Sequence, residues 1–322
     1  MPPITIGGGL RTSFVHADPD DGESSDKFTL DSARLYVTGS VTSKIKLMVN
    51  TEYDGATNDV GIMDAVARLE FSDRMNFWVG RFLPPSDRAN LYGPFYSNHW
   101  SIFTDGVQDG YPFVFQGRDN GALYWGQFDK VKLSAGAFDG ASATGDDTMI
   151  GAGRVQVDFW DAEPGYYQNA TYYGEKNILA IGGAGQVQGG DKSAYSFDFL
   201  LERKVGGGGA VSLEAEWAKY DHLGGYDPQY GTDDGGYVLG AYLFPAGSGP
   251  GRFQVLGKYA HARFREGLTV DDADYNQKTT ELNLNYVLKQ FNARAMFFFK
   301  DTRFDAVRAN FVQVGIGLQF QM

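Results

Sequence analysis

The chain has 322 residues, enough for two ordinary domains or one large β-barrel, and it contains 43 glycines and 15% aromatic residues. Cysteine is absent, which excludes disulfides, zinc–thiolate sites and cysteine nucleophiles, and a formal net charge of −12 argues against a nucleic-acid partner. No apolar run approaches the roughly 18 residues of a membrane-spanning helix, so the composition fits either a soluble protein or a transmembrane barrel with alternating strands.

Strands are expected along most of the chain, because apolar and polar residues alternate with a period of two and the helical period fits poorly. The alternation is clear at 44–53 and returns at 281–286 and 312–320. In chain order, the expected strands lie near 4–16, 27–40, 44–54, 61–71, 75–82, 118–128, 130–138, 149–160, 177–188, 192–204, 209–220, 236–244, 252–265, 276–287, 291–300 and 309–321. The sequence therefore predicts an all-β fold with about 16 strands.

The length of these strands separates two all-β interpretations. A soluble sandwich or barrel usually has strands of about five or six residues, whereas many of the strands expected here reach about ten. Aromatic residues also gather near the strand ends, where a membrane-interface girdle would lie. These aromatic residues are Tyr53, Phe71, Phe159, Trp160, Trp217, Tyr220, Tyr286 and Phe320. The pattern favours a transmembrane antiparallel β-barrel.

Short and long connections alternate along the chain, as expected when one barrel end carries turns and the other carries loops. The strand number is even only if 83–117 leaves and returns at the same end, so we expect this stretch to be one long insertion. We expect it to fold into the lumen and constrict the pore of a single barrel domain that covers 1–322. The stretch 161–176 is an irregularity, because it is long yet falls on the turn side.

Four segments carry a resemblance to a known family. They are Arg34–Gly39 leading into 44–54, Val79–Pro85 before the insertion, Ala135–Gly140, and the stretch from Phe159 through Glu163-Pro164-Gly165 to Gly182. These segments resemble the phosphate-selective porin O and P family, the last of them most specifically. The resemblance implies a 16-stranded homotrimeric pore with anion preference in the bacterial outer membrane, in contact with lipid and lipopolysaccharide. The first four residues show no targeting pattern, so we expect that a signal peptide has been removed.

Positively charged residues on and beside the insertion are the candidate anion path. They are Arg34, Lys44, Lys46 and Arg88, with Arg81 and Arg118 flanking the insertion, and the expected counter-charges are Asp87, Asp105 and Asp109. Rings of charged side chains select ions in channels, and the fork of arginine suits phosphate or carboxylate. The alternative is that each charge only keeps a wet wall solvated and pairs with a neighbour. The expected function is a water-filled channel for passive diffusion of small hydrophilic solutes and ions, including anions such as phosphate.

No catalytic residue, metal site or cofactor is expected. The histidines have no metal-ligand spacing among them; they are His16, His99, His222 and His261. His99 lies near Ser97 on the insertion, but no nucleophile elbow accompanies the pair. Two other functions stay open: a non-conducting barrel that acts as a structural sheath or anchor for a partner protein, and an outer-membrane hydrolase. A sheath would need a wide lumen, which the long insertion disfavours.

Overall fold

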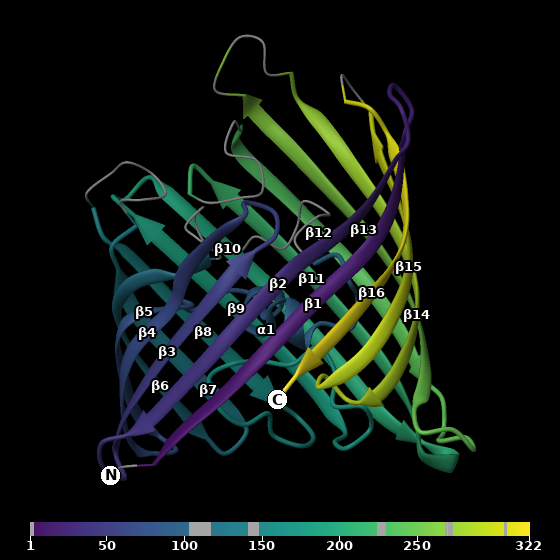
Figure 1. Ribbon diagram of the computed structural model, residues 1–322. Coiled ribbons are helices and arrows are strands. Elements are labelled where there is room, and N and C mark those ends of the chain that lie inside the picture. The colour runs from purple at the N-terminus through teal and green to yellow at the C-terminus, as the bar shows by residue number, and fades with distance from the viewer. Residues whose placement is uncertain are drawn as a thin grey trace.

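The computed structural model describes residues 3–102, 117–140, 148–223, 230–267, 269, 273–305 and 308–322. Within these ranges the chain forms a closed barrel of 16 antiparallel strands, in which each strand pairs with its neighbours in sequence and β1 pairs with β16 (Figure 1). Closure satisfies the backbone groups that an open sheet would leave free at its edges. The expected fold class, an antiparallel barrel of about 16 strands, is confirmed.

The described elements follow one another without long helices. The strands are β1 (Ile4–Pro19), β2 (Ser25–Ser40), β3 (Ile45–Asp54), β4 (Asp59–Ser72), β5 (Met75–Phe82), β6 (Asp119–Phe128), β7 (Val131–Phe138), β8 (Ile150–Asp158), β9 (Ile178–Gln188), β10 (Lys192–Val205), β11 (Gly209–Asp221), β12 (Tyr230–Leu243), β13 (Arg252–Gly267), β14 (Tyr275–Lys289), β15 (Ala293–Phe304) and β16 (Phe311–Gln321). The short helices are α1 (Arg88–Tyr92), η1 (Pro94–Tyr96) and η3 (Gly206–Gly208). In the described part of the chain, no helix is long and apolar enough to cross a membrane.

Every expected strand has a counterpart in the barrel, and the largest difference lies at the start of β12. The sequence placed 230–235 in a polar loop, whereas β12 begins at Tyr230 and pairs with β13 through this stretch. Asp234 lies opposite Arg263 in the register, and the Arg263 Nε donates to the Asp234 Oδ2 at 3.1 Å. The cross-strand pair stabilises an acidic residue within the strand. From composition alone, this acidic stretch is expected to be a loop.

The barrel wall is polar inside and apolar outside, the reverse of a soluble protein. In β14, Glu281 and Asn285 are buried among lumen residues, while the alternate residues Leu282 and Leu284 are exposed on the outer surface. The same alternation leaves the Phe297 side chain of β15 50% exposed on the outside. A single period-two pattern therefore supplies both an apolar outer surface and a polar lumen.

The wall has an uneven height. Strands β5 to β8 contain 8 to 10 residues each, whereas β12 to β14 contain 14 to 16 (Figure 1). Both chain ends lie at the end of the barrel that carries the turns, because β1 starts there and β16 ends there.

Candidate functional site

Two chain segments enter the barrel from opposite ends and meet inside it. The loop segment, 83–102, follows β5 at the loop end, and the turn segment, 159–177, connects β8 to β9 at the turn end. Nearly all residues of the loop segment are buried, and its helix α1 lies within the ring of strands (Figure 1). The turn-side stretch that was irregular in the sequence is therefore long because it folds inward.

Backbone hydrogen bonds join the two segments. The Gln168 N–H donates to the Leu91 carbonyl at 3.3 Å, and the Ala170 N–H donates to the Tyr96 carbonyl at 3.1 Å. The Asn98 Nδ2 returns a hydrogen bond to the Ala170 carbonyl at 3.2 Å. The segments thus satisfy each other's backbone groups, which would otherwise be buried without partners.

A buried ion pair crosses the same junction. The Arg88 Nη1 of the loop segment donates to the Glu163 Oε1 of the turn segment at 3.0 Å and to the Asn169 carbonyl at 3.1 Å. Neither charged side chain is exposed, and the Arg88 Nε lies 3.5 Å from Asp198 of β10. Burial alone would raise the pKa of Glu163, but the Arg88 charge and its hydrogen bond outweigh burial and hold that pKa below its usual value. Glu163 therefore stays ionised and bound to Arg88.

The helix that carries Arg88 begins at an acidic cap. The Asp87 Oδ1 accepts a hydrogen bond from the Asn90 N–H at 2.8 Å, as an N-cap residue should. Asp87 is fully buried, and burial, followed by the nearby charge of Asp198, raises the pKa of Asp87 to about 6. Its carboxyl group therefore titrates close to neutral pH.

Cationic residues of β1 and β15 hold the loop segment against that part of the barrel wall. The Arg11 Nη2 of β1 donates to the Trp100 carbonyl at 2.9 Å, and its guanidinium lies 3.9 Å from the centre of a Trp100 ring. The Arg294 Nη2 of β15 donates to the Phe95 carbonyl at 3.2 Å. A Cβ atom at Gly317 of β16 would lie 2.4 Å from the Trp100 ring, so glycine at this position makes room for the indole.

The acidic wall of β11 contacts the loop segment from another side. The Glu214 Oε1 accepts hydrogen bonds from the Tyr92 hydroxyl at 2.8 Å and from the Tyr237 hydroxyl at 2.6 Å. The Glu216 Oε2 accepts a longer one from the Ala89 N–H at 3.4 Å. Together with the cationic anchors, these contacts fix the loop segment across the lumen.

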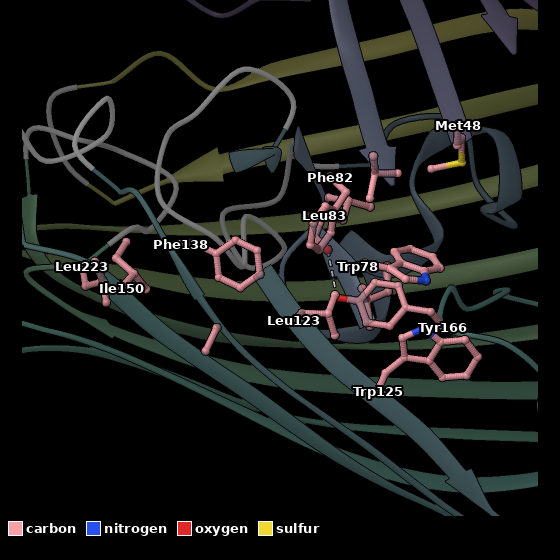
Figure 2. Packing of buried hydrophobic residues seen from close by; sticks show 13 residues of the cluster. Met48, Trp78, Phe82, Leu83, Leu123, Trp125, Phe138, Ile150, Tyr166 and Leu223 are labelled. Atoms are coloured by element: carbon pink, nitrogen blue, oxygen red, sulfur yellow. Dashed lines mark hydrogen bonds between the residues drawn. The ribbon is translucent and has the colours of Figure 1, made fainter. Parts of the chain in front are cut away.

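An apolar cluster packs the two segments against the wall of β3 to β8. Trp78 and Trp125 of the wall lie beside Tyr166 of the turn segment, and the Tyr166 hydroxyl donates to the Leu83 carbonyl at 2.8 Å (Figure 2). Burial of a large apolar side chain contributes about 1.5 to 3 kcal/mol, so several such side chains stabilise the inward position strongly. The cluster keeps the segments on a defined wall.

Two of the cavities beside the segments lie along the wall of β2 to β6. The loop-side cavity has a volume of about 290 Å³, and Arg34, Arg118 and Tyr96 contribute to its lining. The turn-side cavity has a volume of about 500 Å³, and Lys46 contributes to its lining. Tyr167 of the turn segment lines both, so this ring stands between the two cavities.

Each cation of the loop-side cavity is paired with a carboxylate. The Arg34 Nε donates to the Glu52 Oε1 at 2.9 Å, and its guanidinium also lies 4.6 Å from the Phe95 ring centre. The Arg118 Nε lies 3.4 Å from the Asp64 Oδ1. The charges of these two arginines are therefore largely balanced by carboxylates at the cavity wall.

The turn-side cavity repeats this balance. The Lys46 Nζ donates to the Glu70 Oε2 at 2.6 Å, and the Arg68 Nε lies 3.7 Å from the Glu70 Oε1. Asp73 lines the same cavity. Four cationic side chains therefore line the two cavities, and four carboxylates line them or pair with a lining cation. The cations are Arg34, Lys46, Arg68 and Arg118, and the carboxylates are Glu52, Asp64, Glu70 and Asp73.

The structure brings three of the six predicted basic residues to the cavities: Arg34, Lys46 and Arg118. Lys44 is exposed in the turn before β3, with its Nζ 5.9 Å from the centre of the Phe71 ring.

The other predicted residues lie elsewhere. Arg88 and Asp87 are fully buried between the two segments and β10, so Arg88 serves as an anchor and does not line an open path as the sequence had suggested. Arg81 has the register of the outward residues of β5, and its Nε donates to the Ile62 carbonyl at 3.2 Å. Asp105 and Asp109 lie outside the described residues.

Sequence reasoning missed the roles of Glu163 and Tyr167. Both belong to the turn segment, which was noticed for its length but was given no place in the site. The signal that could have located them is the stretch Glu163-Pro164-Gly165 followed by paired tyrosines, because such aromatic residues are unusual in a solvent-exposed turn.

The described residues contain a serine–histidine contact without the rest of a hydrolytic site. The Ser97 Oγ lies 3.1 Å from the His99 Nδ1, but both residues are fully buried. The His99 Nε2 faces the Lys258 Nζ at 3.2 Å, where a carboxylate would be needed to orient a catalytic base. Burial, followed by the Lys258 charge, holds the pKa of His99 well below its usual value. No group of three or more potential metal ligands occurs within the described ranges.

Comparison with solved structures identifies the fold. A structure of Salmonella typhi OmpF in complex with daunomycin is 12% identical with a TM-score of 0.63, covering 100% of this chain and 98% of that one. A loop-deletion mutant of the outer-membrane protein OmpT of Vibrio cholerae is 13% identical with a TM-score of 0.61, covering 99% of both chains. An anion-selective porin from Comamonas acidovorans is 14% identical with a TM-score of 0.59, covering all of both chains. No family model and no curated protein matches the sequence. The chain thus has the fold of outer-membrane porins.

Proposed function

We propose that this chain is an outer-membrane channel through which small hydrophilic solutes and ions diffuse passively. The observation that carries the proposal is the pair of cavities along β2 to β6, which share Tyr167 in their linings and leave space beside the two inward segments. A polar barrel interior of this size suits an aqueous path, and the porin fold supports the same assignment.

The outer surface supports a location in the bacterial outer membrane. Outward residues such as Leu282 and Phe297 are apolar and exposed, and outward aromatic residues such as Phe77 and Phe253 lie near the turn end. An apolar band with aromatic girdles is the pattern of a lipid-facing barrel wall. Lipid and lipopolysaccharide are therefore the proposed surroundings of a single barrel domain.

The residues of the path support weak charge selectivity. We assign Arg34, Lys46 and Arg118 to the path, with Lys44 at its turn-side mouth. The resemblance to phosphate-selective porins would favour anions, and these residues are where an anion would pass. However, each of the cavity-lining cations has a carboxylate partner, and equal numbers of opposite charges give little net field for selection.

The two inward segments form the proposed constriction. The loop segment is anchored on several strands and the turn segment is joined to it by hydrogen bonds and the Arg88–Glu163 pair. A constriction fixed from both ends favours a narrow channel over a wide sheath around a partner protein. We further propose a homotrimer, since one of the similar structures is described as a trimer form of Vibrio cholerae OmpT.

Conduction in a planar bilayer tests the proposal. Purified protein should insert with discrete conductance steps, and a salt gradient should give a reversal potential close to zero. Added phosphate should leave the current of a weakly selective channel unchanged, whereas phosphate block would restore the selectivity of the resembling family. Insertion without any conductance would favour the sheath or anchor function instead.

A further inference from the structure

The loop-side cavity offers aromatic surface to a passing solute. Tyr36 of β2, Tyr96 of the loop segment and Tyr167 of the turn segment contribute to its lining. The Tyr96 side chain is 38% exposed, and Tyr36 and Tyr167 are partly exposed. These tyrosine rings come from three separate parts of the chain, so they do not simply reflect the alternation of side chains along a single strand.

Neutral polar groups accompany these rings. The amides of Asn50, Gln168 and Asn169 line the same cavity. Gln168 is buried, and its Oε1 accepts no hydrogen bond from the described residues. The Tyr167 hydroxyl is also buried and likewise forms no hydrogen bond with the described residues. A small number of placed polar groups within an aromatic lining is typical of a ligand site.

The cations of this cavity are poorly placed for a free anion. Arg34 uses both its Nε and an Nη atom on Glu52, and Arg118 faces Asp64. An entering phosphate would have to displace a carboxylate from its charge-assisted hydrogen bonds, which are among the strongest in proteins. A neutral solute meets no such competition.

We propose that the loop-side cavity is a subsite for neutral ring-shaped polyols, that is, for saccharides; this inference rests on the proposed channel function. A sugar ring presents apolar C–H faces that pack on tyrosine rings, and hydroxyl groups that both donate and accept hydrogen bonds. The Gln168 Oε1 and the Asn169 amide suit such hydroxyl groups, whereas the amide nitrogens of Asn50 and Gln168 already donate to Asp64 and Gln156. The volume of about 290 Å³ lies near the lower limit of small-ligand cavities, so one sugar ring at a time matches the space.

Single-channel recording with glucose and with inorganic phosphate tests the subsite. Glucose should reduce the current in a saturable manner, beyond the reduction caused by viscosity, and phosphate at equal concentration and matched ionic strength should not. Tyr167→Ala and Tyr96→Ala should each weaken the apparent glucose affinity by several-fold to about tenfold, through loss of a packed ring face. Tyr167→Phe should retain most of the affinity, because it keeps the ring.

Tyr259→Ala is the matched control, because Tyr259 is an exposed ring that lies on the outer surface. It should leave the glucose effect unchanged. A conducting channel that shows no saturable response to glucose, or one that phosphate blocks equally well, would overturn the subsite while leaving the channel function intact.

Tryptophan fluorescence of detergent-solubilised protein separates the two proposals. The Trp78 ring lies 5.7 Å from the Tyr167 ring between their centres, so glucose bound beside Tyr167 should change the emission in a saturable way. Saturable binding by a protein that does not conduct would support the subsite and reject the channel. Absence of both binding and conduction would overturn both.

Discussion

Removal of the charge on Glu163 should loosen the junction between the two inward segments. In Glu163→Gln the side chain keeps its shape and an oxygen that can accept from Arg88, but it loses its charge. The Arg88 guanidinium, which is fully buried, is left with Asp198 at 3.5 Å as its nearest remaining carboxylate. The variant keeps the side-chain volume, but it removes the charge and places an amide N–H₂ where one carboxylate oxygen accepts from Arg88 and from either Tyr172 or Gln156.

The expected cost follows from the burial of both partners. Removal of one member of a fully buried ion pair typically destabilises a protein by about 3 to 5 kcal/mol, because the other charge remains without compensation. Asp198 offsets a part of this here, so we expect about 2 to 3 kcal/mol. The barrel strands are hydrogen-bonded independently of the junction, so the loss should appear as local opening of the inward segments.

Single-channel recording and chemical unfolding measure the two consequences. Glu163→Gln should give a larger mean conductance with more current fluctuation, and a lower urea midpoint for the change in tryptophan emission near Trp78. Glu175→Gln is the matched control, because Glu175 belongs to the same segment but is exposed. It should behave like the unmodified protein.

A double-mutant cycle decides whether the Arg88–Glu163 ion pair causes the loss of stability and the change in conductance. If Arg88 and Glu163 act through each other, Arg88→Met combined with Glu163→Gln should cost less than the sum of the two single changes. Strict additivity, or a conductance equal to that of the control, would refute the idea that this pair holds the constriction.

Three further changes test other parts of the structure. Asp87→Asn should remove one contribution to the pH dependence of stability. The pKa of Asp87 in the folded protein, about 6, lies above its ordinary value, so Asp87 should contribute about 2 kcal/mol of added stability as pH falls from about 7 to 4. Urea unfolding at both pH values should show the variant gaining less, or losing more, stability than the unmodified protein. Arg34→Ala with Arg118→Ala leaves two unpaired carboxylates beside the cavity, so the reversal potential in a salt gradient should move toward cations, and an unchanged potential would remove these arginines from the path. Phe297→Lys places a charge on the outer surface and should destabilise the bilayer-inserted barrel by about 2 to 4 kcal/mol, measured by unfolding from lipid vesicles; a negligible change would contradict a lipid-facing wall.

The sequence by itself determined the barrel. Alternation with a period of two repeats along nearly the whole chain, and it is a local property that needs no tertiary information. The pairing of long and short connections then required 83–117 to be one insertion, and it gave β5 with both ends correct at 75–82. The start of β12 was misplaced because acidic residues resemble a loop until their cross-strand partners are known.

The site was predicted only in part. Arg34, Lys46 and Arg118, which line the two cavities, could be singled out because strand parity and proximity to the insertion are both readable in a sequence. The burial of Arg88, which keeps it from lining a cavity, could not be predicted from the sequence. It depends on the contact with Glu163, which lies 75 residues away along the chain.

Only the tertiary structure decided how the lumen is filled. The strand pattern fixes which side chains face inward, but it carries no information about which inward residues meet an inserted segment. Arg11 and Arg294, for example, lie on the inner face of the wall, and both donate to backbone carbonyls of the loop segment. The physical reason is that strand alternation arises from local geometry, whereas the pairing of charges across a lumen depends on contacts between residues far apart in the chain.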